Sequence, residues 1–150
     1  MEFSFTAEQK MIRDTAQAFL TEVSSSTAIR SAMATEQGYD DKLWQRICDE
    51  MYWQAIHIPE EYGGMGLGYV ELVIVLEQMG RTLLCSPFFS TVCLAANALM
   101  VAGTEEQKQQ YLSDICAGSL TATLAYTGSN GQWGVEAIPG TVTLDNSNYV

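Results

Sequence analysis

The spacing of apolar residues along this chain predicts that most of it is helical. Apolar side chains recur every three or four positions through several segments, which is the period of a helix with one buried face. The predicted helices cover residues 7–22, 27–34, 69–81, 88–102 and 104–118, with one more that includes 43–51. The 88–102 helix is apolar nearly all round, which is typical of a helix buried in a core or a subunit contact.

Local signals support the ends of these helices. Two pairs of residues have the spacing of a capping box, in which each side chain of the pair bonds the backbone N–H of the other. These pairs are Thr6 with Gln9 and Thr104 with Gln107. Asp40 or Asp41 can cap the helix that includes 43–51. Residues 55–68 hold a proline and four glycines, so we expect an ordered loop there.

The pattern changes after residue 119. Residues 120–126 are rich in β-formers and predict a strand, and 127–134 form a polar, glycine-rich loop. A second strand is expected at 135–138, and the last ten residues, which read TVTL, DNSN and YV, have the pattern of a hairpin.

This change of pattern predicts two domains of unequal completeness. A stable sheet needs three or more paired strands and a covered face, and the predicted strands stop before they can pair. We therefore expect a helical domain at 1–119 and the truncated start of a β domain at 120–150. The chain would then be a fragment of a longer protein.

The charge of the chain disfavours two classes of partner. The sequence has 18 acidic and 7 basic residues, a net charge of −11, and the basic residues form no cluster. Nucleic-acid affinity comes mainly from Lys and Arg that neutralise phosphates, and anionic membrane surfaces also select basic segments. No segment approaches the roughly 20 apolar residues of a membrane span, and the first residues do not resemble a signal peptide. We expect a cytoplasmic protein that binds no nucleic acid and has no membrane span.

The four cysteines predict buried free thiols in a reducing compartment. They stand at positions 48, 85, 93 and 116, mostly with apolar neighbours, and no two form a Cys-x-x-Cys pair. A zinc site would need further His or Cys at ligand spacing, and His57 is the single histidine of the chain. No metal site is predicted.

Few residues have a spacing that indicates catalysis. His57 has no carboxylate, Ser or Cys placed as a triad partner, so a structural or surface histidine is the better interpretation. The adjacent Glu60 and Glu61 are interpreted as a solvated pair. The glycines of 63–68 lack the Lys-Ser/Thr ending of a phosphate loop. The loop 127–134 is either an ordinary β-turn loop or one whose backbone N–H groups approach an anionic or polar cofactor.

Three segments of the chain carry the motifs of a known family. IPEEYGGMGLG at 58–68, followed by a helix with ELVIVLEQMGR, looks like a PEEYGG loop and the helix after it. GTEEQKQQYLSDICAGSLTATLA at 103–125 is similar to a Gly-Thr-x-x-Gln-Lys segment that leads into a first β strand. With the loop 127–134 at a flavin-binding position, these segments resemble the acyl-CoA dehydrogenase family of flavoproteins over essentially the whole chain.

The resemblance implies a fold and a reaction. The family has an N-terminal helical domain, a central β domain and a C-terminal four-helix domain, so this chain is expected to be mainly α: the helical-bundle domain followed by an incomplete β segment. The implied cofactor is FAD and the implied substrate an acyl-CoA thioester. The implied reaction removes an α proton and transfers a β hydride to flavin N5, which gives the 2,3-enoyl-CoA.

The resemblance also implies site residues on two elements. By position, Leu124, Tyr126 and Thr127 would lie along the flavin, with the Thr127 hydroxyl near N5. Gly131 and Trp133 would stand near the end of the loop, by the pyrophosphate or the thioester. The 88–102 helix looks like the one that lines the acyl pocket, which makes Phe89, Ser90 and Leu94 candidate substrate contacts.

The sequence departs from the family in the flavin loop. The family usually has Thr-Glu-Pro and a Gly-Ser-Asp-like ending, whereas Thr127 is followed by Gly128 and Ser129 and the loop ends Gln132-Trp133-Gly134. The absence of a proline predicts a more flexible loop. The absence of Glu and Pro also leaves a second hypothesis open, in which the protein is a non-catalytic partner that binds acyl groups or assembles with another subunit.

The catalytic base of the family is a carboxylate of the C-terminal domain, and no residue in 1–150 matches it. Because the α proton of a thioester is weakly acidic, a positioned base is required. This chain alone is therefore expected to have no dehydrogenase activity. Apolar surface on 69–81 and 88–102, uncovered when the β and C-terminal domains are cut away, is expected to make the isolated chain self-associate. The protein is expected to form a homo- or hetero-oligomer. Neither the acyl chain length nor the electron acceptor follows from the sequence.

Overall fold

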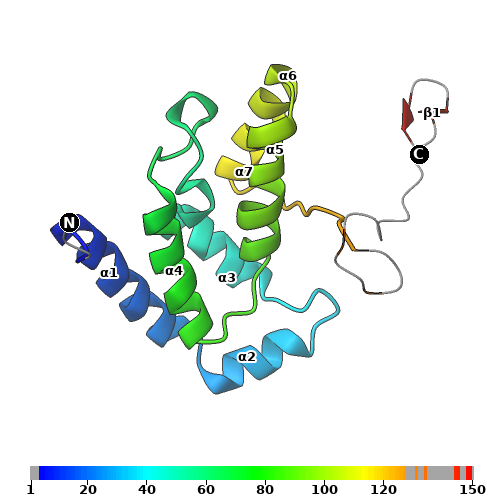
Figure 1. Ribbon diagram of the computed structural model, residues 1–150. Helices are drawn as coiled ribbons and strands as arrows, with labels where there is room; N and C mark the ends of the chain where they lie inside the picture. The colour runs from blue at the N-terminus through cyan, green and yellow to red at the C-terminus, as the bar shows by residue number, and fades with distance from the viewer. Residues whose placement is uncertain (1–3, 128–130, 132–133, 135–143, 146–147, 150) are drawn as a thin grey trace.

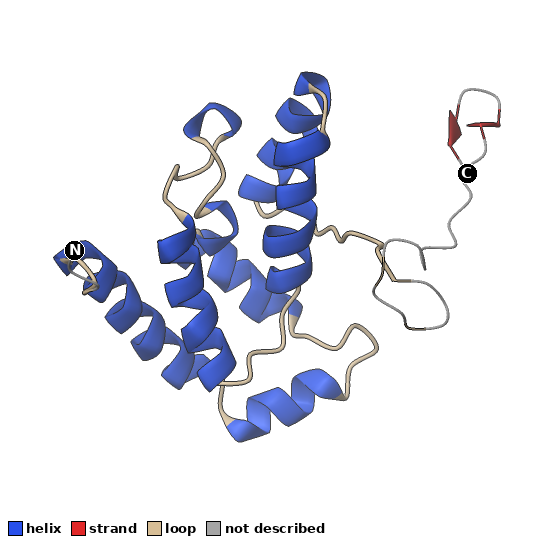
Figure 2. Ribbon diagram, viewed as in Figure 1, coloured by secondary structure: helices blue, strands red, loops and turns tan. Residues whose placement is uncertain are grey.

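The structure is a computed structural model that describes residues 4–127, 131, 134, 144–145 and 148–149. Helices make up most of the described chain, as Figures 1 and 2 show. The α-helices are α1 (Ala7–Val23), α2 (Ser26–Met33), α3 (Asp41–Arg46), α4 (Tyr69–Arg81), α5 (Asn97–Ala102), α6 (Glu105–Gln107) and α7 (Ser113–Cys116). The predicted mainly α class is confirmed.

Three of the predicted helices contain more widely wound π-helical turns. The segment η1 (Ile47–Met51) continues α3. The segment η4 (Phe89–Ala96) runs directly into α5, and together they form the helix predicted at 88–102. The segment η5 (Lys108–Leu112) joins α6 to α7 in the last predicted helix. Two short 3₁₀ turns, η2 (Trp53–Ala55) and η3 (Glu60–Tyr62), lie in and beside the predicted loop.

Both predicted capping boxes form, and one of them extends to a second helix. At the start of α1 the Gln9 backbone N–H donates to the Thr6 hydroxyl at 3.2 Å, and the Gln9 side chain accepts from the Thr6 N–H at 3.0 Å. The Gln9 amide nitrogen then donates to Glu71 at 2.8 Å. Glu71 in turn accepts from the Gly68 N–H at 2.9 Å, at the start of α4. The first turns of α1 and α4 are therefore joined by one set of hydrogen bonds.

The open choice of cap before α3 is settled in favour of Asp40. One of its carboxylate oxygens accepts from the backbone N–H groups of Lys42, at 2.8 Å, and Leu43, at 3.3 Å. Thr104 and Gln107 repeat the reciprocal bonds of a capping box at the start of α6, at 2.9 and 3.3 Å.

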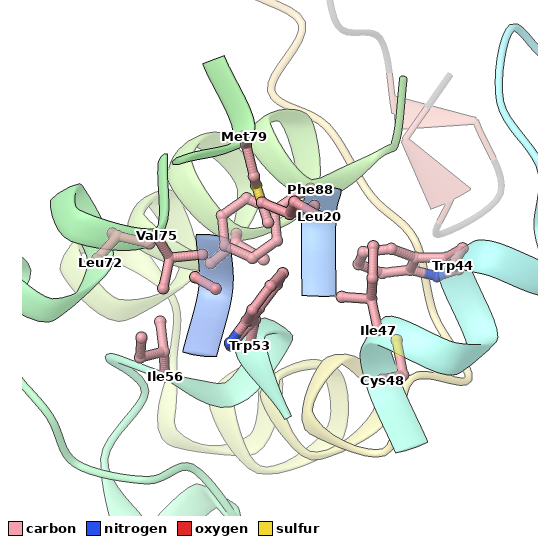
Figure 3. Close-up of a cluster of buried hydrophobic side chains, with 12 residues drawn as sticks. Leu20, Trp44, Ile47, Cys48, Trp53, Ile56, Leu72, Val75, Met79 and Phe88 are labelled. Atoms are coloured by element: carbon pink, nitrogen blue, oxygen red, sulfur yellow. The ribbon is translucent and has the colours of Figure 1, made fainter. Parts of the chain in front are cut away.

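The main core lies where α1 and α4 pack against the helix of α3 and η1 (Figure 3). Its fully buried members include Leu20, Ile47, Val75 and Phe88. Phe19 packs edge-on against Trp53, with 5.5 Å between the ring centroids and 84° between the planes. Such a contact adds roughly 0.5–1.5 kcal/mol to what burial alone contributes.

A second core cluster joins the loop after η2 to the last two helices. Its buried members are Ala55, Ile58, Tyr62, Ala96, Leu112, Ile115 and Cys116. The buried Gln54 side chain reinforces this junction, because its amide nitrogen donates to the carbonyls of Cys116, at 2.8 Å, and Cys48, at 3.3 Å. These bonds join η2, which leads into the glycine-rich loop, to η1 and α7.

The loop at 55–68 is ordered, as predicted, and its backbone groups bond one another. The N–H groups of Met65 and Leu67 donate to the carbonyls of Ala55 and Ile56, at 2.8 and 3.0 Å. Gly66 donates to the carbonyl of Ile58 at 2.9 Å.

Gly64 lies inside this folded loop, where no side chain fits. A Cβ there would stand 1.9 Å from the carbonyl oxygen of Ile58.

The strand predicted at 120–126 is wrong for the described chain. Residues 121–127 have no regular secondary structure and run from α7 past the helix of η4 and α5 (Figure 1). A strand requires a neighbouring strand to bond, and the backbone of Ala122 instead bonds a side chain of η4. The β-formers of this stretch favour an extended backbone, but they supply no partner.

The predicted hairpin forms in a shorter version. Strands β1 (Leu144–Asp145) and β2 (Asn148–Tyr149) pair antiparallel, with Leu144 opposite Tyr149 and Asp145 opposite Asn148. The second strand therefore begins one residue earlier than the sequence suggests. The strand predicted at 135–138 lies outside the described residues.

Candidate functional site

The predicted acyl-contacting residues lie along η4. The Phe89 side chain is 57% exposed, which is high for a large aromatic ring. Ser90 and Leu94 are half-buried, and they stand four residues apart. The Ser90 hydroxyl donates to the carbonyl of Pro87 at 2.9 Å, so its proton is already used within the first turn of the helix. These residues form a partly apolar face that is open in this chain.

The predicted flavin-contacting residues follow on the segment 121–127. Leu124 is 44% exposed, Tyr126 is half-buried and Thr127 is exposed. Gly131 is exposed as well, with a φ of +69° that favours glycine and open space around its Cα. Trp133 lies outside the described residues, so its predicted place in the site stays a prediction.

One hydroxyl joins these two elements. Thr91 is 0% exposed, and its Oγ1 donates to the carbonyl of Ala122 at 3.2 Å. The same oxygen accepts from the Ala122 N–H at 3.1 Å. Sequence reasoning did not single out Thr91. The available signal was a hydroxyl in a helix that is otherwise nearly all apolar.

A hollow of about 490 Å³ lies between α5, the helix of α6 and η5, and residues 120–123. Small side chains line most of it, among them Ala95, Ala98 and Ala122. None of the predicted acyl-contacting or flavin-contacting residues lines this hollow. The candidate site is therefore an open face of η4 beside the segment 121–127.

A larger hollow of about 690 Å³ lies where the end of α1, α2 and the start of α3 meet. Its lining includes Asp40, Asp41 and Arg46 and is partly charged. No residue that the sequence singled out for a cofactor or acyl group lines this hollow either. It carries no chemistry that bears on the candidate site.

His57 is a buried structural residue in the described chain. Its side chain is 7% exposed, and neither ring nitrogen has a hydrogen-bond partner there. The ring lies 5.5 Å from that of Tyr69, whose hydroxyl donates to Asn97 at 2.8 Å. Burial lowers the pKa of His57, and the nearby Asn97 side chain acts in the opposite direction. The interpretation of His57 as a structural residue is confirmed, because its ring is buried and packs against Tyr69 of α4.

The acidic loop residues also behave as predicted. Glu60 and Glu61 are exposed. The neighbouring Tyr62 is buried, and its hydroxyl donates to Glu105 at 2.8 Å, which raises the pKa of Tyr62 to about 12. Hydrogen bonds from Lys108 and Tyr62 lower the pKa of Glu105. This pair anchors the loop to α6.

The described residues contain no cluster of three or more His, Cys, Asp or Glu that could hold a metal ion. The cysteines in them are free: Cys48 and Cys116 are buried, and Cys85 and Cys93 are half-buried. Within the same residues no helix has the length and apolar character needed to cross a membrane.

The segment 121–127 fits a planar cofactor in one respect that the structure shows. The backbone groups of residues 123–125 make no recorded hydrogen bond within the described chain, and their side chains are exposed. Free N–H and carbonyl groups of this kind can bond the polar edge of a planar cofactor, and the protein's part in cofactor chemistry is to bind and orient it. Leu124 and Thr127 supply one of each.

Comparisons with known proteins agree on one family. A family model described as "Acyl-CoA dehydrogenase, N-terminal domain" matches residues 6–119. The curated protein "Acyl-CoA dehydrogenase IpdE2" of Mycobacterium tuberculosis is 35% identical over 117 residues, which are 78% of this chain and 36% of that protein. The chain thus spans about a third of the length of such curated relatives.

Solved structures support the same assignment. The ChsE4-ChsE5 complex from Mycobacterium tuberculosis matches with a TM-score of 0.81 and 26% identity, over 99% of this chain and 39% of the matched chain. An acyl-CoA dehydrogenase from Bacillus anthracis, solved in complex with FAD, matches with a TM-score of 0.81 and 26% identity. That match covers 98% of this chain and 25% of the other.

Proposed function

Because this chain belongs to the acyl-CoA dehydrogenase family, we propose that it is the N-terminal part of a FAD-dependent enzyme that oxidises an acyl-CoA thioester to the 2,3-enoyl-CoA. The observation that carries the proposal is the match of residues 6–119 to the N-terminal domain of the family. The proposed division is a helical domain at 1–119 and the start of a β domain at 120–150.

Two elements of the chain would serve the ligands. The exposed side chains and free backbone groups of 123–125 would lie along the flavin ring, with Leu124 and the half-buried Tyr126 against it and Thr127 offering a hydroxyl. When bound, FAD supplies the hydride acceptor. Phe89, Ser90 and Leu94 would bound the acyl group from the side of η4. The apolar side chains of Phe89 and Leu94 would exclude water from the thioester, which strengthens electrostatic interactions at the reacting carbons.

The first experiment is to purify the whole protein and to add acyl-CoA thioesters of different length and branching without oxygen. A yellow protein whose visible flavin absorbance is bleached by one of them supports the proposal. A protein that binds flavin but is bleached by no thioester would contradict the substrate class. The cytoplasmic location and the homo- or hetero-oligomeric state proposed from the sequence are tested by fractionation and by light scattering of the same sample.

The chain by itself is proposed to be inactive. No residue in 1–150 matches the catalytic carboxylate of the family, and proton abstraction next to a thioester needs a positioned base. Residues 1–150, expressed alone and mixed with FAD, should leave the flavin oxidised in the presence of the thioester that bleaches the whole protein. Detectable bleaching would place a sufficient base within these 150 residues.

A second function is favoured by the departures in the flavin loop. Thr127 is followed by Gly128 and Ser129, without the Glu and Pro of the family. The protein would then be a non-catalytic subunit that binds acyl groups or completes a partner, and the similar ChsE4-ChsE5 structure is a complex of two proteins. A colourless protein that restores activity to a yellow partner would support this alternative. A protein that is yellow and active without a partner would exclude it.

A further inference from the structure

Resting on the proposed flavoprotein function, we propose that Thr91 is a positioning residue that fixes the flavin-side segment 121–127 against the acyl-side helix η4. Thr91 is 0% exposed, so its role would not require contact with either proposed ligand. It acts through Ala122, whose two backbone groups it holds.

The contact is unusual because one hydroxyl bonds both backbone groups of a single residue. Oγ1 of Thr91 donates to the Ala122 carbonyl at 3.2 Å and accepts from the Ala122 N–H at 3.1 Å. A neighbouring strand offers a residue the same two bonds through its own backbone. Thr91 is 0% exposed and Ala122 is half-buried, so water has limited access to the two bonds. The side chain therefore takes the place of a strand partner at this position.

The attachment matters because, within the described residues, few hydrogen bonds hold residues 120–125. Before Ala122, the N–H groups of Ser119 and Leu120 both donate to the carbonyl of Asp114, at 3.1 and 3.3 Å. Beyond Ala122, residues 123–125 make no recorded hydrogen bond within the described chain. Leu124 lies two residues after Ala122, and Thr127 lies five residues after it. A displacement at Ala122 would therefore carry the proposed flavin contacts with it.

Thr91 also stands among the proposed acyl contacts in the sequence. It directly follows Phe89 and Ser90 and precedes Leu94 by three residues, all within η4. One rigid helical segment thus bounds the acyl group and holds the segment that would bear the flavin. A misplacement of about 1 Å between two reacting groups can reduce a rate by about a hundredfold. The geometry points to Thr91 as the residue that sets this relation.

The test uses the whole protein with its flavin and four variants. Thr91→Val keeps the shape of the side chain and removes both hydrogen bonds, and Thr91→Ser keeps the hydroxyl. If the Val variant does not fold, Thr91→Ala replaces it as the variant that lacks both hydrogen bonds. Thr27→Val makes the same chemical change on an exposed residue of α2, away from the candidate site, and is the matched control. Two readouts are measured: hydrogen exchange resolved at the Ala122 amide, and kcat and KM for the thioester that reduces the wild type.

We expect Thr91→Val to speed exchange at Ala122 by about tenfold, since its N–H loses a buried acceptor. We expect kcat to fall by roughly tenfold or more with little change in KM, because the ligands still bind but are misaligned. Thr91→Ser should restore both values, and Thr27→Val should change neither. If Val does not fold, Ala should show the loss and Ser should not.

Two results would overturn the proposal. The first is an exchange rate and kcat in Thr91→Val that equal those of the wild type. The second is a loss that Ser fails to restore, which would assign the effect to packing of the methyl group. A wild-type protein that binds no flavin would instead remove the proposed function. The exchange readout would still decide whether Thr91 holds Ala122.

Discussion

Replacing Gly64 by alanine should destabilise this protein severely, although the change adds a single methyl group. The Cβ would stand 1.9 Å from the Ile58 carbonyl oxygen, 2.4 Å from its carbonyl carbon and 2.7 Å from its Cβ. Ile58 is 0% exposed and lies in the second core cluster, so it has no open space to move into. The obstacle is backbone and buried side chain, and no rotamer change relieves it.

The size of the stability loss follows from how far the Ile58 backbone must move. The nearest contact has to lengthen by about 1.1 Å to reach the 3.0 Å below which real Cβ contacts are essentially never found. That shift breaks the bonds from Gly66 to the Ile58 carbonyl, at 2.9 Å, and from Gly64 to the Pro59 carbonyl, at 3.1 Å. Each lost bond costs about 1 kcal/mol, and overpacking adds about 1–3 kcal/mol. The free energy of unfolding should fall by about 3–5 kcal/mol, a large part of the roughly 5–15 kcal/mol of a typical domain.

Urea unfolding followed by tryptophan fluorescence measures this change, since Trp44 and Trp53 are both buried. Gly80→Ala is the matched control, because Gly80 lies in α4 with nothing within 4 Å of its added Cβ. That variant should gain about 0.5–1 kcal/mol from helix propensity. A Gly64→Ala protein within about 0.5 kcal/mol of the wild type, at an unchanged urea slope, would refute the steric argument.

Three further predictions rest on separate features. Burial lowers the pKa of His57 in the folded protein, so on acidification His57 is protonated in the unfolded chain at a higher pH than in the folded one. Stability should fall as the pH drops below about 6.5, and the melting temperature of His57→Gln should vary less over that range, whereas equal slopes would contradict this. Burial raises the thiol pKa of Cys48 to about 12 and of Cys116 to about 11, so both should resist alkylation at about pH 8 until urea unfolds the protein; fast labelling of the native form would count against it. Thr104→Ala removes the cap of α6 and should cost about 1 kcal/mol in urea unfolding, with Thr104→Ser close to the wild type; equal losses in both variants would not fit a capping role.

The helices could be predicted from the sequence because their signals are local. The Thr6 capping box starts α1, Gly68 precedes α4, and the apolar spacing between such signals marks the buried face. All of this information lies within a few residues of each helix end. The choice of Asp40 over Asp41 needed the structure, since both have a side chain suited to a cap.

The misassigned strand at 120–126 shows where local information stops. β-formers favour an extended backbone, but the partner that completes a ladder lies elsewhere in the chain. Here Thr91, 31 residues before Ala122, takes that place. The bond from Tyr69 to Asn97 likewise spans 28 residues of sequence.

The candidate site was assigned by resemblance and not by spacing. No periodicity places Leu124 or Thr127 against a ring, and no pattern distinguishes Phe89 as a substrate contact from Phe89 as a core residue. The structure adds that Phe89 is exposed and that its helix is joined to the segment of Leu124. The contacts with ligands themselves remain predictions.

The hydrogen bonds that link Gln9, Glu71 and Gly68 have a consequence for cooperativity. Helix ends normally fray independently, each with its own small opening free energy. Here the side chain that closes the first turn of α1 also holds the carboxylate that closes the first turn of α4, 62 residues away. Opening either turn removes a partner from the other, so the two ends should open together as one unit. Mutations at Thr6 and Gly68 should therefore be non-additive, although no bond joins those two residues directly.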